Sequence, residues 1–322
     1  AKIFRLPTYK IVAERYPINK RNRRCKELLE MVKKENIDSA IIQTRFWTTS
    51  YIASKFVDKN NIPACLIEHG STHFTVNNKV LDFFGEIYEH MLTNSIKKRV
   101  KDFYGVSKKC TEWLKHFGIK AKGVFYNSVN TDEIEEYSKF INKDTGKLII
   151  TYTGRMIEEK GVPRLIEAFK NLDSKYENLE LDLAGDGPIL EKIIQENKDV
   201  KNIKVLGKIS HQEVMELLGK TNIFVNPSHF SEGLPTTILE AGMMKCAVVA
   251  TPMGGTTEII TDDNIGYICG FETSEIQEKI EKIINDKEKM KKLGTNIKEK
   301  VEKDFSWNTT AKKIATTIKY SK

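Results

Sequence analysis

Short apolar runs alternate with amphipathic segments along the second half of the chain. Helical spacing of apolar positions occurs at 162–171, 188–197, 211–219 and 236–245. The apolar runs around these segments predict strands at 148–154, 179–185, 203–207, 223–228, 247–252 and 265–270. Short buried strands that alternate with helices predict a parallel sheet covered by helices on both faces. The second half is therefore expected to be a complete, doubly wound α/β domain.

The first half has the same rhythm with fewer strands. Strands are expected at 39–43, 64–69, 100–106 and 123–126, and helices at 22–34, 51–59 and 108–117. Turn residues at 142–146 (NKDTG) indicate the domain boundary. The expected domains are residues 1–143, incomplete at the start, and residues 144–305. Residues 306–322 are expected to form a helix that packs back towards the first domain.

Composition and absent motifs exclude several classes of protein. Apolar residues make up 40% and charged residues 30% of the chain, which argues against disorder. No apolar run approaches the ~18 residues of a membrane-spanning helix. Five dispersed cysteines indicate reduced thiols in a cytosolic protein. The dinucleotide, P-loop, serine-hydrolase and zinc-protease motifs are absent, and no Asp-x-Asp pair offers a metal site, so no metal is expected.

Four segments of the second half place chemically useful groups after predicted strands, where doubly wound sheets bind ligands. Arg155 and Lys160 supply two cations that can neutralise a diphosphate without a metal. Gly185, which opens a Gly-Asp-Gly-Pro turn, and the Lys208–Ile209 strand end allow a close approach of backbone to ligand. For each of these segments alone, an ordinary turn or surface charge remains an alternative. The candidate ligand-binding residues here are Gly154, Gly185, Asp186, Lys208 and Ile209.

The fourth segment carries two glutamates on a loop and the helix that follows it. Glu232 lies in the loop, and Glu240 lies eight positions later on a helix that is otherwise apolar and therefore buried. Free amides at the start of this helix can hold phosphate oxygens, with help from the helix dipole. Glu240 can accept hydrogen bonds from ribose hydroxyls. The other ligand-binding candidates are Gly233, Leu234, Pro235, Thr236 and Thr237.

These linked motifs resemble the retaining glycosyltransferases of family four, which have the two-domain fold called GT-B. The resemblance covers residues 147–260, and its motifs are Gly154-Arg155 with Lys160-Gly161, Gly185-Asp186-Gly187-Pro188, Ser231-Glu232-Gly233, Glu240-Ala241 and Gly254-Gly255-Thr256-Thr257-Glu258. In the first half, Glu68-His69-Gly70 resembles the family's strand end at the acceptor cleft. The resemblance implies two Rossmann-like domains facing a cleft, with His69 beside the transferred sugar. It also implies an opening strand and glycine-rich loop that residues 1–20 do not supply, so we expect these to be missing.

The resemblance implies transfer of a sugar from a nucleotide-sugar donor, a UDP-sugar, with retention of configuration and without metal or cofactor. The acceptor is expected to be a saccharide or lipid-linked saccharide of cell-surface polysaccharide synthesis. The implied catalytic residues are Arg155 and Lys160 at the departing diphosphate, Glu232 at the sugar and leaving group, and His69 at the reacting carbon. Two alternatives remain open: a GT-B sugar-nucleotide epimerase, and a donor-binding protein without catalysis.

The basic charge of the chain is concentrated at its start. Residues 1–26 hold nine lysines and arginines against one glutamate, and the chain as a whole has the same net charge of +8. Residues 20–34 join the densest part of this charge to a helix with an apolar side. We interpret them as a contact with an anionic membrane surface, in a cytoplasmic protein held peripherally at the inner face. A solvated helix face is the alternative, and nucleic acid is not expected because aromatic residues do not interleave the charges.

Overall fold

The computed structural model describes residues 2–11, 16–76 and 78–319. The chain forms two compact units, one of Ala1–Phe125 with Lys312–Lys322 and the other of Tyr126–Ala311. This division falls before the expected boundary at 143 because residues 126–141 pack into the second unit. Ile134, Tyr137 and Ile141 all contact the core around its helix α9. Each unit is described separately below.

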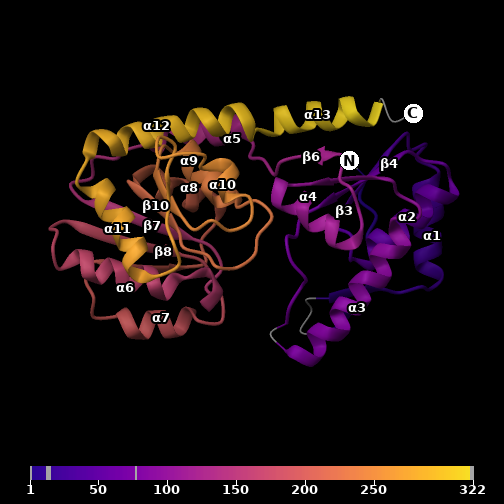
Figure 1. Ribbon diagram of the computed structural model, residues 1–322, viewed down its shortest axis with the longest axis horizontal. Coiled ribbons are helices and arrows are strands. Elements are labelled where there is room, and N and C mark those ends of the chain that lie inside the picture. Colours follow the sequence, from indigo (N-terminus) through magenta and orange to yellow (C-terminus); the bar gives the residue numbers. More distant parts are fainter. Residues whose placement is uncertain (1, 12–15, 77, 320–322) are drawn as a thin grey trace. The chain divides into compact units, whose positions relative to one another are not determined.

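The second unit is built on a parallel sheet in the strand order β12-β11-β10-β7-β8-β9 (Figure 1). All six strands expected from the sequence are present, although several end earlier than expected. The order runs outwards in both directions from the β7–β10 pair, so the sheet is doubly wound and its switch point lies between these strands. The strands are β7 (Leu148–Thr153), β8 (Leu179–Ala184), β9 (Ile203–Gly207), β10 (Ile223–Asn226), β11 (Ala247–Ala250) and β12 (Tyr267–Ile268).

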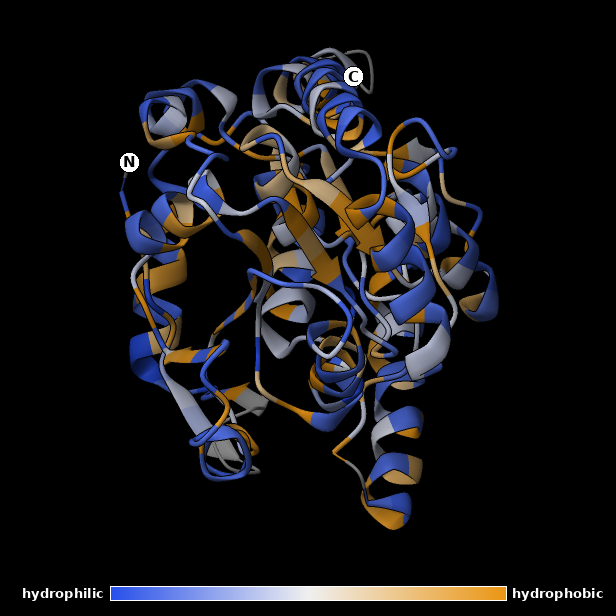
Figure 2. Ribbon diagram, turned by 90° about the vertical axis from the view of Figure 1, so that its left-hand side faces the viewer, coloured by the Kyte–Doolittle hydropathy of each residue, from blue (hydrophilic) through white to orange (hydrophobic). Residues whose placement is uncertain are grey.

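Helices cover both faces of this sheet because successive strand residues point to opposite sides. Val225 packs with α6, α7 and α11 in one core, whereas the adjacent Phe224 packs with α8, α9 and α12 in another. Figure 2 shows apolar strands between helices whose outer surfaces are hydrophilic. The helical segments are α5 (Thr131–Glu135), η2 (Glu136–Phe140), η3 (Glu158–Lys160), α6 (Val162–Asp173), α7 (Leu190–Asn197), α8 (His211–Lys220), α9 (Thr236–Met243), α10 (Thr256–Ile259), α11 (Thr273–Ile284) and α12 (Lys287–Asp304).

The first unit has a smaller parallel sheet in the order β3-β4-β5-β6, as the sequence predicts. Its strands are β3 (Ala40–Gln43), β4 (Ala64–Glu68), β5 (Asp102–Gly105) and β6 (Gly123–Val124). The antiparallel hairpin of β1 (Thr8–Ile11) and β2 (Tyr16–Asn19) was not expected from the sequence. The helical segments are α1 (Arg23–Lys33), α2 (Thr48–Lys59), α3 (Lys79–Ile96), α4 (Lys108–Leu114) and η1 (Lys115–Phe117).

The sequence analysis also named no helix where α3 lies, and the burial of this helix is unusual. Its buried residues include the polar Glu89 and Thr93, whereas Phe83 and Phe84 are exposed. The usual alternation of buried apolar and exposed polar positions is therefore reversed over much of the helix. Its apolar residues Val80, Phe84, Ile87 and Met91 recur at helical spacing, so the sequence carries the signal for a helix but not for which of its faces is buried.

Helix α13 (Trp307–Lys319) ends the described chain. Within the first unit, its residues Ile314 and Ile318 pack against a small core that includes Ile67, Tyr104 and Phe125. The opposite face of the same sheet packs on α2, α3 and α4. None of the helices in the described ranges combines the length and apolar character needed to cross a bilayer.

Candidate functional site

The ends of β7, β8 and β9 approach one another closely in the second unit. The Gly154 amide donates to the Ala184 carbonyl over 3.0 Å, and the Gly185 amide donates to the Gly207 carbonyl over 2.8 Å. Gly185 has φ +147°, and a Cβ atom there would overlap the Gly154 carbonyl oxygen. Glycine is therefore required at Gly185 both by conformation and by space. The result is a floor of exposed backbone at the carboxyl edge of the sheet.

A pocket of about 400 Å³ opens above this floor. Its size lies within the roughly 300–1,000 Å³ range of ligand pockets. It brings together eight candidate donor-site residues that span 87 positions of the chain: Gly154, Arg155, Gly185, Asp186, Lys208, Ile209, Thr237 and Glu240. The Asp186 carboxylate accepts from the Gly187 amide over 2.7 Å, so this side chain holds its own turn.

His211 lies at the same pocket and was missed by the sequence analysis. Helix α8 starts with a capping box in which Ser210 and Glu213 satisfy each other's backbone amides, and this fixes His211 as the first helical residue. Its Nε2 lies 3.4 Å from a carboxylate oxygen of Glu240. Burial raises the pKa of Glu240, and the neighbouring His211 opposes the rise. The available signal was the capping box, which predicts the helix start and therefore the position of His211.

The switch point holds a second group of candidate residues. Lys160, at the end of η3, forms an ion pair with Glu232 from the loop after β10. The Arg155 guanidinium lies 5.3 Å and the Lys160 ammonium 5.6 Å from the centre of the Phe230 ring, so both cations lie near one aromatic ring. Burial, and then the Arg155 charge, lower the pKa of Lys160 to about 8. The Glu232 carboxylate acts against this shift because an opposite charge favours the ammonium.

The Glu232 loop is held in place by the segment that follows β11. The Gly255 amide donates to the Gly233 carbonyl over 2.9 Å. Gly254 has φ +54°, and a Cβ atom there would overlap the Glu232 carbonyl oxygen. The paired glycines therefore allow two loops to lie against each other and set the position of Glu232.

Helix α9 starts directly after this loop. Its N-cap is Pro235, and among the described residues no side chain caps this end. Leu234 and Pro235 are buried, whereas Thr236 and Thr237 are partly exposed. The first turn therefore presents amide groups next to the pocket, which is the usual arrangement for binding an anion. Leu234 can contact a ligand only through its backbone, because its side chain packs in the core.

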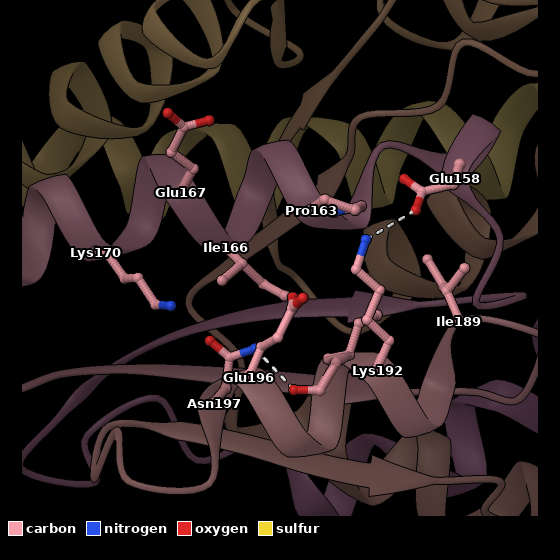
Figure 3. Close-up of a pocket in the computed structure, with 10 residues that line it drawn as sticks. Glu158, Pro163, Ile166, Glu167, Lys170, Ile189, Lys192, Glu196 and Asn197 are labelled. Atoms are coloured by element: carbon pink, nitrogen blue, oxygen red, sulfur yellow. Dashed lines mark hydrogen bonds and ion pairs between the residues drawn. The ribbon is translucent and has the colours of Figure 1, made fainter.

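A different hollow of about 220 Å³ lies between α6 and α7 (Figure 3). The Lys192 ammonium lies 3.5 Å from a carboxylate oxygen of Glu158, and Asn197 donates to the Ile193 carbonyl over 2.8 Å. The candidate site residues named from the sequence do not line this hollow. Glu196, on its rim, is a useful control position for the experiments below.

His69 belongs to the first unit and lies just beyond β4. Its Nε2 is 2.6 Å from the Gln43 amide oxygen, which orients the ring. Burial lowers the pKa of His69. The adjacent Glu68 is fully buried, accepts from the Gly70 amide over 2.8 Å and faces Arg45, so the turn after His69 is firmly held.

The second unit matches a known protein family over most of its length. Residues 109–300 match the family described as glycosyl transferases group 1. An uncharacterised glycosyltransferase of Methanocaldococcus jannaschii is 30% identical over 272 residues, which are 83% of this chain and 71% of that protein. A capsular polysaccharide biosynthesis glycosyltransferase of Staphylococcus aureus is 29% identical over 168 residues, which are 50% of this chain and 42% of that protein.

Solved structures show the same fold. The Anabaena protein HepE, crystallised in complex with UDP, matches 91% of this chain and 82% of its own with a TM-score of 0.72 at 16% identity. At this identity the likeness concerns the fold alone. The fold is α/β of the GT-B type, with two Rossmann-like domains, as the sequence analysis expected.

Proposed function

The chain belongs to the glycosyl transferases group 1 family, and from this premise we propose that it moves a sugar from a UDP-sugar to a saccharide or lipid-linked saccharide. In this proposal the configuration at the transferred carbon is retained, as the resemblance to family four implies. The observation that carries the proposal is the gathering of seven expected donor-binding residues and the expected catalytic Arg155 around one pocket at the carboxyl edge of a doubly wound sheet. The UDP complex of the similarly folded HepE supports the choice of nucleotide.

The two ends of the site suit the two ends of a nucleoside diphosphate. Glu240 accepts hydrogen bonds from the ribose hydroxyls, and the backbone at Lys208–Ile209 contacts the edge of the base. The free amides of α9 and the Arg155 guanidinium hold the phosphates. The His211 Nε2 lies 3.4 Å from a Glu240 carboxylate oxygen, orients this carboxylate for the ribose and opposes the rise in its pKa that burial causes.

Bond cleavage places new negative charge on the diphosphate. The bond from the sugar carbon to the β-phosphate oxygen breaks, and UDP leaves with that electron pair. The acceptor hydroxyl oxygen bonds to the same carbon, and its proton passes to the departing phosphate oxygen. Lys160 and Arg155 stabilise the charge, a role in which pre-positioned cations are effective because they need no rearrangement. Glu232 orients Lys160 through the ion pair and is placed to contact the sugar.

We assign no metal to the donor site, because Arg155 and Lys160 supply two positive charges where a divalent ion would act. Transfer is therefore expected to be unchanged when Mg²⁺ or Mn²⁺ is added to enzyme purified without them. A strict requirement for either ion would contradict this part of the proposal.

His69 is the proposed contact to the sugar near the reacting carbon. The Gln43 amide oxygen fixes the ring, and the lowered pKa keeps it neutral at physiological pH. Because Nε2–H donates to the Gln43 amide oxygen, the neutral imidazole has Nδ1 left as an acceptor for a sugar hydroxyl, and it adds no charge at the sugar.

The acceptor side is proposed to work at the inner face of a membrane in cell-surface polysaccharide synthesis. The capsular polysaccharide enzyme among the relatives supports the pathway class. Helix α1 and the residues before it carry Arg21, Arg23, Arg24 and Lys26, all exposed. Cationic residues of this kind attract anionic headgroups.

Exposed apolar residues of the same unit add to this surface. Val80, Phe84, Ile87 and Met91 recur on α3 at helical spacing, and all four are at least 44% exposed. Arg21 lies near α3. Burial raises the pKa of Tyr88 on this helix, and the charge of Arg21 opposes the rise. A basic segment beside an apolar helical stripe is the combination that binds bilayer interfaces.

Calorimetric titration with UDP tests the donor site. We expect binding by the parent chain and a loss of at least about tenfold in affinity for Glu240→Gln, because a charged acceptor for the ribose is removed. Glu196→Gln, in the α6–α7 hollow, is the matched control and should bind like the parent. Equal affinity in all three proteins would overturn the assignment of the pocket.

Product analysis separates the three activities that remained open after sequence analysis. A transferase yields a lengthened acceptor from a UDP-sugar, whereas an epimerase converts the UDP-sugar when no acceptor is present. UDP binding without either product would identify a donor-binding protein without catalysis.

A further inference from the structure

Three histidines of the first unit converge on one point. His73 lies in the loop between β4 and α3, His90 on α3 and His116 on η1. The His116 Nε2 is 3.2 Å from the Nε2 of His73 and 3.2 Å from the Nε2 of His90. The potential ligand atoms of all three lie within 4.8 Å of one another. Ring nitrogens of three separate elements therefore face a common centre.

From this geometry we propose that His73, His90 and His116 bind a zinc ion through their Nε2 atoms. Zinc–imidazole bonds of about 2.0–2.1 Å at tetrahedral angles place the ligand nitrogens about 3.3 Å apart. The two observed separations of 3.2 Å fit this spacing. Three imidazoles without a carboxylate in the first sphere favour zinc over magnesium or calcium, which prefer oxygen ligands.

The surroundings of His73 add an independent argument. Its Nδ1 lies 3.1 Å from a carboxylate oxygen of Glu89, which is buried. A carboxylate at Nδ1 holds the proton there and leaves the Nε2 lone pair free to bind a cation. Histidines that bind metals usually have such a partner at their second nitrogen.

Glu89 is itself held rigidly. It accepts from the Phe74 amide over 2.8 Å and from the Arg45 guanidinium over 2.9 Å. Arg45 is fully buried and faces two carboxylates, those of Glu68 and Glu89, and the Glu89 oxygen that pairs with Arg45 also contacts His73. The positive charge nearest to the proposed ion is thus already neutralised.

The other two ligands are supported by packing. The His116 ring stacks on Trp113 at 4.7 Å between centroids with 4° between the planes. Lys97, at the end of α3, donates to the Phe117 carbonyl over 2.8 Å and so ties η1 to α3. His116 is exposed, so water can complete the coordination on that side.

The ion would join three elements that are otherwise linked mainly through side chains. The loop that carries His73 starts at His69 and Gly70, so the ion would fix the path of the chain immediately after the proposed sugar contact. This inference concerns a site apart from the donor pocket and does not depend on the proposed function. We expect the ion to stabilise the first unit and to take no part in the transfer chemistry.

Zinc binding is best tested on the full chain without an affinity tag of histidines. The chain is stripped with a chelator, desalted and titrated with Zn²⁺ in competition with a chromogenic chelator. We expect one equivalent to bind and the melting temperature to rise, because zinc binds the folded state preferentially. Replacement by Co²⁺ should produce the visible absorption of a tetrahedral site.

Variants locate the site. His116→Ala, at an exposed position, and His90→Gln should each weaken zinc binding by more than the roughly 10–100-fold that outer-sphere substitutions cost. His229→Ala is the matched control, because this histidine is exposed and lies in the other unit. Circular dichroism shows whether each variant is folded. Absence of stoichiometric zinc in the parent, or parental affinity in both ligand variants, would overturn the proposal, whatever the result with UDP.

Discussion

Lys160 and Glu232 form an ion pair that joins the segments following β7 and β10. These two strands are the neighbours from which the strand order runs outwards in both directions. The side chains are only 13% and 18% exposed, so the pair is largely shielded from water. Charges in such a setting interact more strongly with a ligand than surface charges do. The pair therefore holds an ammonium at the point where doubly wound sheets bind their ligands.

Removal of either switch-point cation should slow transfer. Lys160→Ala and Arg155→Ala are each expected to lower kcat by roughly 10²–10³-fold, the usual effect of losing one group that stabilises developing charge. Lys192→Ala is the control, because Lys192 pairs with Glu158 at the surface of the α6–α7 hollow. Steady-state rates with a UDP-sugar and acceptor provide the measurement. Parental rates in both cation variants would refute the assigned roles.

Donor binding should depend on the charge of Lys160. Its pKa is lowered to about 8, and only the ammonium attracts phosphate, so affinity is full below this pKa and falls as pH rises through about 8. The bound diphosphate favours the ammonium, so the fall in kcat should occur at higher pH than the fall in kcat/KM.

The pH profile of Lys160→Arg supplies the control. A guanidinium stays charged over this range, so the decline in kcat/KM near pH 8 should disappear in this variant even where its overall rate is lower. An unchanged decline would assign the titration to another group.

That the pocket residues lie together was predictable from the sequence, because they follow strands at fixed positions. Strand ends in a parallel sheet meet at one edge, so Arg155, Gly185 and Lys208 had to lie near one another once the strands were recognised. His211 was not recognised, because a histidine at a helix start has no distinctive spacing to Glu240. Its position depends on how α8 packs, which is a tertiary property.

The histidine cluster could not be predicted in the same way. His73 and His116 are 43 positions apart in the chain, and the sequence analysis expected no metal ligands. Helix α3, which carries His90, has its apolar residues exposed and Glu89 buried, so the sequence did not indicate that the His90 side of the helix faces the first unit. The spacing of a motif can indicate metal ligands only when they lie on one element or on adjacent elements. The three histidines come from a loop, a long helix and a short 3-10 turn.

Gly185, which directly follows β8, is expected to be essential for the stability of the fold. Gly207→Ala introduces a side chain at φ +65° with open space around it, and should cost about 1–2 kcal/mol. Alanine at Gly185 would have an unfavourable φ and would also overlap the Gly154 carbonyl. The loss of unfolding free energy in Gly185→Ala should therefore be clearly larger. Urea denaturation followed by circular dichroism compares the two. A loss for Gly185→Ala equal to or below that for Gly207→Ala would show that the strand ends separate easily.

Membrane binding should have separable electrostatic and apolar parts. Arg24→Glu combined with Lys26→Glu should lower partition onto anionic vesicles by at least about 2 kcal/mol, or roughly 30-fold, since each basic residue near the surface contributes about 1 kcal/mol. The same variant should lose most of the salt dependence. Phe83→Ser combined with Phe84→Ser, at positions that are 60% and 62% exposed, should instead weaken binding at both low and high salt.

Vesicle sedimentation with neutral and anionic lipids measures both parts. Lys291→Glu combined with Lys292→Glu on α12 is the matched control, because it reverses the same amount of charge in the other unit. An equal loss of binding in this control would indicate a response to net charge alone. Salt-independent binding by the parent, or no binding at all, would contradict the membrane role and would indicate that α1 is a solvated helix. The Phe83 and Phe84 variant distinguishes a surface that inserts into the bilayer interface from one that is only attracted to anionic headgroups. Charge reversal does not change the burial of these two side chains in lipid.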